Sequence, residues 1–172
     1  MPKFNRFSIG SFIVIGLFVV LLTGFIALLF FNDSSTSDPN DLTEFIDGQL
    51  LAETHHYNEL YEQTFTSLNN EDFEAAFDYA EQASEESKRL EILYASYSIP
   101  SDLPEHIMSL FEAATSDLSV AYAVNTEAFL LLMEYIETQD SVLRDQAEDK
   151  FAEAETYIES ALFRLERIKT EN

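Results

Sequence analysis

The chain has 172 residues, of which 32 are acidic and nine are basic, so its formal net charge is −23 at pH 7. A chain this acidic repels the phosphates of nucleic acids, and we therefore expect no nucleic-acid partner. It contains no cysteine, which excludes disulfides, thiolate metal sites and a cysteine nucleophile. The length suits one domain that buries a core of its own.

An apolar stretch without a charged residue occupies residues 9–31. As a helix its 23 residues would reach about 35 Å and would cross the roughly 30 Å hydrocarbon core of a lipid bilayer. Lys3 and Arg6 precede the stretch, and the positive-inside rule then places residues 1–8 in the cytoplasm. The sequence thus predicts a single-pass protein of the cell membrane, with the N-terminus cytoplasmic and the C-terminal domain outside.

The apolar stretch is more typical of an uncleaved signal anchor than of a cleaved signal peptide. A signal peptide has a shorter apolar region and small residues before its cleavage site, whereas residues 28–31 are all bulky. Gly16, Thr23 and Ala27 fall on one face of the predicted helix, where small residues let a second transmembrane helix approach closely. If the anchor pairs with a second transmembrane helix, we therefore expect this face to form the packing contact.

A polar linker at residues 32–40 leads into an acidic extracytoplasmic helical bundle at residues 41–172. Residues 32–172 hold all 32 acidic residues but only seven of the nine basic ones. This charge has two interpretations. It is either a solvated surface, as in proteins of salt-adapted organisms, or a surface that attracts cations or a basic partner.

Apolar residues recur at helical spacing in four parts of this domain. The predicted helices cover residues 41–68, 70–97, 103–138 and 141–169. Connections this short join antiparallel neighbours. The predicted fold class is therefore all-α, with a single N-terminal transmembrane helix followed by an antiparallel up-down-up-down four-helix bundle.

Local signals mark the boundaries of these helices. Gly48 weakens the first helix slightly. Asn69 is the predicted cap of the second helix. Asp102 and Glu105 are spaced as in a capping box at the start of the third helix.

Three bases lie in the last turns of the fourth predicted helix, namely Arg164, Arg167 and Lys169. In an up-down bundle this end returns towards the membrane, so the three side chains are predicted to contact lipid headgroups at the membrane surface. The alternative is that they only complement the dipole at the C-terminus of their helix.

Two carboxylate patterns bear on catalysis. Glu53 and His56 form one Glu-x-x-His motif, whereas ferritin-like di-iron bundles use two such motifs. Glu127 and Glu134 share one face of the third predicted helix, a coincidence expected in a chain with 32 acids. We predict solvated side chains at these positions, no metal, no cofactor and no enzymatic activity.

The expected function is that of a non-catalytic accessory or interaction subunit, which contacts another envelope protein or a second copy of itself. The alternative is a sensor or small-ligand-binding bundle that signals through a membrane partner. An accessory subunit needs an exposed apolar patch, whereas a sensor needs a polar-lined pocket or a dimer face. Residues 129–133 are apolar nearly all round, so we expect their far face to meet another helix or a partner. The tyrosines that could serve either function, or simply rim the core, are Tyr57, Tyr61, Tyr94, Tyr97, Tyr122 and Tyr135.

Overall fold

The computed structural model describes residues 42–99 and 103–171, and every regular element in these ranges is helical. In chain order the elements are α2 (Leu42–Phe45), the π-helix η1 (Ile46–Leu50), the 3₁₀-helix η2 (Ala52–Thr54), α3 (His55–Asn69), α4 (Phe73–Ala95), α5 (Glu105–Thr138) and α6 (Ser141–Glu171). The predicted anchor at residues 9–31 and linker at residues 32–40 lie outside the described residues. None of the helices that the structure describes is both long and apolar enough to cross a bilayer.

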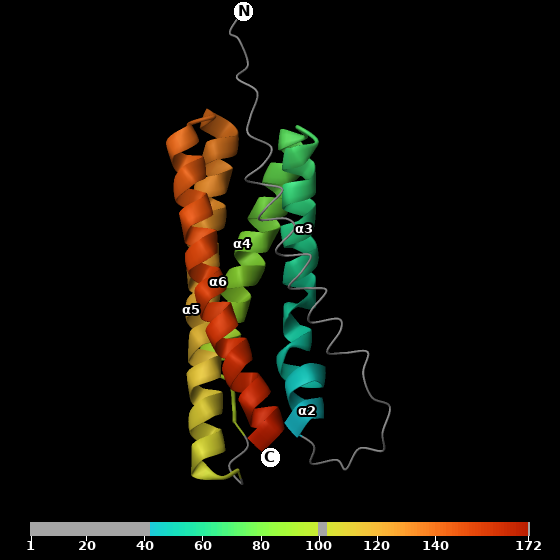
Figure 1. Cartoon of the computed structure of the whole chain (residues 1–172). Helices are drawn as coiled ribbons and strands as arrows, with labels where there is room; N and C mark the ends of the chain where they lie inside the picture. Colours follow the sequence, from blue (N-terminus) through green and yellow to red (C-terminus); the bar gives the residue numbers. More distant parts are fainter. Residues whose placement is uncertain (1–41, 100–102, 172) are drawn as a thin grey trace, which may run out of the picture.

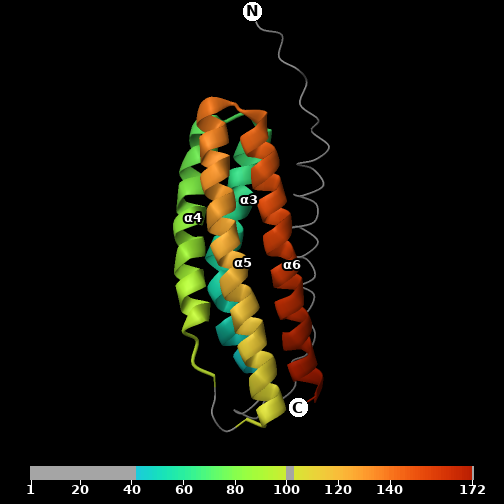
Figure 2. The same cartoon turned by 90° about the vertical axis from the view of Figure 1, so that its left-hand side faces the viewer.

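Helices that follow one another in the chain are neighbours in space. α3 packs on α4, α4 on α5 and α5 on α6, and the chain runs up and down in turn (Figure 1). Figure 2 shows α5 between α4 and α6, with α3 behind it. α2 and the last turns of α6 meet at one end of the bundle (Figure 1). The prediction of an all-α up-down bundle is confirmed for the described residues.

The first predicted helix is interrupted, so the prediction of one continuous helix over residues 41–68 is wrong. Leu42, Ile46 and Leu50, which span the change from α-helix to π-helix, are buried on the core face. The same four-residue spacing occurs at the buried residues Ala114, Leu118 and Tyr122 within the regular helix α5, so the spacing by itself does not require a π turn. Gly48 lies within η1 and has no side chain to resist the change.

The connection between α3 and α4 also differs from the prediction. Asn69 does not cap the second helix but is the last residue of α3. Glu71 then adopts a left-handed conformation with φ 59°, and the Asp72 amide donates to the Ser67 carbonyl at 3.0 Å. This bond and the left-handed conformation of Glu71 end α3 in a Schellman motif. The Asp72 side chain accepts from the Ala75 amide at 3.2 Å, so α4 begins later than predicted.

The other helix starts lie close to their predicted positions. α5 begins at Glu105 with Pro104 as its N-cap residue, and the predicted capping residue Asp102 lies outside the described ranges. α6 begins at residue 141, as predicted. Its first turn is capped by the Asp140 side chain, which accepts a backbone hydrogen bond at 2.9 Å.

Aromatic rings from three helices meet in the core. Phe129 on α5 is fully buried, and its ring centroid lies 5.0 Å from that of Phe151 on α6 and 5.9 Å from that of Tyr61 on α3. Phe65 on α3 extends the cluster, at 5.5 Å from Phe151. Most of these pairs are edge-to-face, the favourable arrangement for aromatic rings. The rings therefore join α3 to α5 and α6.

Small residues accompany the rings where α4, α5 and α6 meet. Buried alanines line these helices: Ala76, Ala80 and Ala83 on α4, Ala114, Ala121 and Ala128 on α5, and Ala147, Ala154 and Ala161 on α6. None of the buried residues of α3 is alanine. The backbones of α4, α5 and α6 can therefore approach closely, whereas α3 depends on its large side chains for contact with α5 and α6.

We expect Phe129→Ala to lower the free energy of unfolding of the full-length chain by about 3–5 kcal/mol, because it opens a cavity among rings from three helices. Urea denaturation in mild detergent, followed by circular dichroism, measures this loss. The control is Phe163→Ala, which removes a ring that is 68% exposed and should cost less than about 0.5 kcal/mol. Equal losses in the two variants would contradict this description of the core.

Candidate functional site

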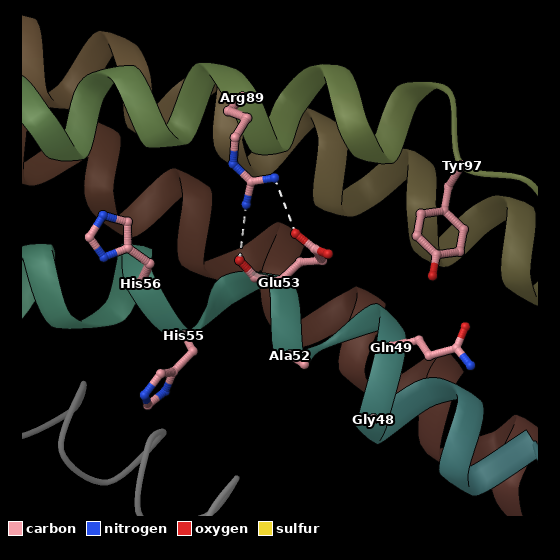
Figure 3. Close-up of a pocket in the computed structure, with 8 residues that line it drawn as sticks. All are labelled: Gly48, Gln49, Ala52, Glu53, His55, His56, Arg89 and Tyr97. Atoms are coloured by element: carbon pink, nitrogen blue, oxygen red, sulfur yellow. Dashed lines mark hydrogen bonds and ion pairs between the residues drawn. The ribbon is translucent and has the colours of Figure 1, made fainter.

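A hollow opens on the surface where the first helix is interrupted, between this helix and α4 (Figure 3). Its volume is about 600 Å³. Most of the residues that line it are polar, and the lining consists of Gly48, Gln49, Ala52, Glu53, His55, His56, Arg89 and Tyr97. The two sides of the hollow thus come from segments that are far apart in the sequence.

The interruption leaves backbone carbonyls that a regular helix would satisfy. The Thr54 amide donates to the Leu51 carbonyl at 3.1 Å, instead of to Leu50 as in an α-helix. The Leu50 carbonyl accepts from the hydroxyl of Tyr94 on α4 at 2.9 Å, and this bond is buried. A buried carbonyl without a partner is costly, so Tyr94 is part of what makes the interruption stable.

Arg89 on α4 binds the interruption of the first helix from its solvent-exposed side (Figure 3). Its guanidinium donates to the Glu53 carboxylate at 3.1 Å and to the Glu53 carbonyl at 3.3 Å. It also donates to the carboxylate of Glu86, one turn earlier on α4, at 2.7 Å. The bonds to Glu86 and Glu53 raise the pKa of Arg89, so its charge is permanent.

The Glu-x-x-His motif does not converge on one point. The Glu53 carboxylate is bonded to Arg89, and His56 points in a different direction (Figure 3). His55 Nε2 and His56 Nδ1 instead lie 3.3 and 3.9 Å from the Glu59 carboxylate, on the exposed face of α3. In the ranges that the structure describes, no group of three histidine, cysteine or acidic side chains is arranged to hold a metal ion.

A layer of tyrosines lies behind the hollow, within the core. Tyr94 stacks on Tyr122 of α5, with ring centroids 5.7 Å apart, and Tyr57 of α3 meets Tyr122 edge-on at 5.1 Å. The hydroxyls of Tyr57 and Tyr122 lie near the side chains of Ser87 and Thr54, which partly offset the effect of burial on the pKa of each phenol. The layer thus packs α3, α4 and α5 around the interruption.

Burial raises the pKa of the tyrosines in this layer, and that of Tyr61, well above the usual value of a phenol. The charged phenolate would lose its hydration in the core, so the neutral form is favoured. Tyr135 is buried as well, whereas Tyr97 is half-buried and borders the hollow. Of the six tyrosines considered from the sequence, Tyr97 is therefore the one placed to meet a ligand in the hollow.

The three bases near the end of α6 differ in their exposure. Arg164 pairs with Asp117 on α5. The Lys169 ammonium lies 2.7 Å from the carboxylate of Asp47 in η1, and its side chain is only 11% exposed. Arg167 is exposed. Their contact with a membrane surface stays a prediction, although this end of α6 does lie beside α2 (Figure 1).

The remaining candidate residues fall into two groups. Glu127 and Glu134 are exposed on α5, and Glu127 pairs with Lys150 at 2.9 Å. The residues assigned to membrane topology and transmembrane packing lie outside the described ranges: Lys3, Arg6, Gly16, Thr23 and Ala27. Their roles therefore stay predictions.

Sequence reasoning did not single out Arg89 or Asp47 as parts of a site, and it considered Tyr94 only as one of six tyrosines that could serve a pocket, a contact face or the rim of the core. The partners of Arg89, Tyr94 and Asp47 lie 36, 44 and 122 residues away along the chain. The one local signal was Gly48, which lies in η1 and lines the hollow. A glycine inside an otherwise helical pattern indicates a position where the backbone departs from the α-helix.

Comparison of the chain with protein-family models, with curated proteins and with solved structures found no match. Function is therefore inferred from the sequence and from the geometry of the described residues.

We expect Tyr94→Phe to lower the free energy of unfolding of the full-length chain by about 1–2 kcal/mol, because the buried Leu50 carbonyl loses its donor. Urea denaturation measures the loss. The matched control is Tyr79→Phe, which removes the same oxygen atom from a half-buried ring on α4 and should change stability by less than about 0.5 kcal/mol. If both variants unfold at the same urea concentration, the Tyr94 hydroxyl does not stabilise the interruption.

Proposed function

We propose that this protein is a membrane-anchored, non-catalytic accessory subunit, whose helical bundle lies outside the cytoplasm and contacts another protein of the cell envelope. The observation that carries the proposal is a set of large apolar side chains that stay more than half exposed on three helices. These are Ile92 on α4 at 61%, Leu130 on α5 at 53%, and Val142 and Phe163 on α6 at 58% and 68%. A partner protein that covers such side chains would remove apolar surface from water.

Leu130 is the clearest example of an exposed apolar side chain that a partner could cover. Phe129 and Leu132 are buried in the core, whereas Leu130 points outward from the same apolar run. Its neighbours along the exposed face, Glu127 and Glu134, are charged. The sequence predicts that the far face of this run meets another helix or a partner, and Leu130 is the residue on that face.

The charge of the domain favours a different protein as partner over a second copy of the chain. Residues 32–172 contain 32 acids and seven bases, so two copies of the bundle repel one another. A partner with a basic surface would be attracted instead. Self-association through the anchor, along Gly16, Thr23 and Ala27, remains compatible with this charge because the anchor itself contains no acid.

The second candidate function is a small-ligand-binding bundle that signals through a membrane partner. The hollow beside the interrupted helix favours it, because Glu53, Arg89 and Tyr97 bring a carboxylate, a guanidinium and a phenol to one opening. A small polar ligand in this hollow would contact both the interrupted helix and α4.

The proposed orientation predicts how single cysteines will be labelled. Because the chain has no cysteine, Ser8→Cys and Gln146→Cys each introduce one thiol, the first before the predicted anchor and the second on the exposed surface of α6. In intact cells a membrane-impermeant maleimide should label the second variant and not the first. Both should react once the membrane is permeabilised. Labelling of the first variant in intact cells would overturn the predicted orientation.

The accessory-subunit proposal predicts a stoichiometric partner that depends on one exposed apolar residue. Crosslinking of the full-length chain in its native membrane, gentle detergent extraction and mass spectrometry identify what is recovered with it. Among Ile92→Asn, Leu130→Asn and Phe163→Asn, the variant in the contact face should reduce recovery about fivefold or more, and the other two serve as matched controls. Recovery of the chain alone would favour the second candidate function.

A further inference from the structure

Residues 42–54, which comprise α2, η1 and η2, form a segment that the helical backbone joins only weakly to α3. The Leu51 amide donates to the Ile46 carbonyl at 2.9 Å, a π-type bond, and the Thr54 amide donates to Leu51 at 3.1 Å, a 3₁₀-type bond. The His55 amide, at the start of α3, likewise donates to the Ala52 carbonyl, so the regular α-helical pattern of hydrogen bonds is broken where the segment joins α3. Because helix stability is cooperative along an unbroken pattern, either side of the break can unfold without the other.

The segment is held to the bundle mainly by side chains of other helices. Leu42, Ile46 and Leu50 are buried in the core, and the ring of Phe45 meets that of Phe111 on α5 at 5.8 Å. At the end next to α3, the hydroxyl of Tyr94 and the guanidinium of Arg89 hold the carbonyls of the break.

The ion pair between Asp47 and Lys169 joins the middle of the segment to the last turns of α6. The two charged atoms are 2.7 Å apart, and the side chains are only 18% and 11% exposed. The attraction at such a position is less screened by water and salt than at the surface. If one partner is removed, the other is left largely buried without its counter-charge, which favours an open segment.

We infer that residues 42–54 act as a latch, which the Asp47–Lys169 ion pair holds closed and which opens as a unit while α3, α4, α5 and α6 stay packed. The four helices have their own contacts, through the ring cluster around Phe129 and through the buried alanines. Opening uncovers the side chains of Leu42, Ile46 and Leu50, together with the surface of the bundle on which they lie. The latch thus controls access to apolar surface at the end of the bundle where α2 begins.

Hydrogen exchange of the full-length chain in mild detergent, read by mass spectrometry, tests this inference. In Lys169→Met the amides of residues 46–54 should exchange about tenfold faster or more than in the wild type, whereas those of residues 118–132 in α5 should not change. The matched control is Lys150→Met, which removes the partner of Glu127 from an exposed pair on α6 and should leave both regions unchanged. Exchange that rises equally in both regions, or in neither, would overturn the latch.

A second pair of variants separates the ion pair from a general loss of stability. Asp47→Asn changes the side chain little in shape but removes its charge, and it should speed exchange in residues 46–54 alone. The reversed pair, Asp47→Lys with Lys169→Asp, should return the exchange of these amides towards the wild-type rate. If the reversed pair exchanges as fast as the single variants, the attraction between the two charges does not close the latch.

Discussion

Ring packing between Phe129, Phe151 and the tyrosines of α3 is the contact on which the arrangement of the four helices depends. The buried alanines let α4, α5 and α6 approach closely, but α3 has none and reaches the other helices through large side chains. The three ring contacts of Phe129 with α3 and α6 have centroid distances between 5.0 and 6.2 Å. This cluster therefore sets the position of α3 relative to α5 and α6, and with it the position of the opening between the first helix and α4.

The interrupted first helix also buries apolar side chains in the core. Leu42, Ile46 and Leu50 follow one another at four-residue intervals and lie on the core face where the α-helix changes to a π-helix. The change of helix type leaves the Leu50 carbonyl without its α-helical partner, and the hydroxyl of Tyr94 supplies a donor. The interrupted helix, the hydrogen bond of a buried tyrosine and the hollow thus occur together at residues 46–54.

Most of the few basic side chains of the domain form salt bridges within the molecule. Salt bridges to acidic side chains are made by Arg89, Arg144, Lys150, Arg164 and Lys169. Most of them are exposed enough to contribute little to stability, whereas Lys169 and Asp47 are largely buried. Because these bases are occupied by internal pairs, most of the acids remain uncompensated at the surface.

Four properties could be predicted from the sequence alone, namely the helical class, the number and approximate limits of the bundle helices, the up-down order and the acidity of the domain. These properties follow from apolar periodicity and short connections, which are local features of the sequence, and from composition, which is a sum over its residues. The interruption at residues 46–54 and the pairing of Asp47 with Lys169 were decided by the tertiary structure. The choice between an α and a π turn depends on which side chains the neighbouring helices bury, and the partner of a base depends on which acid the packed helices bring beside it. No spacing along the chain records either of these.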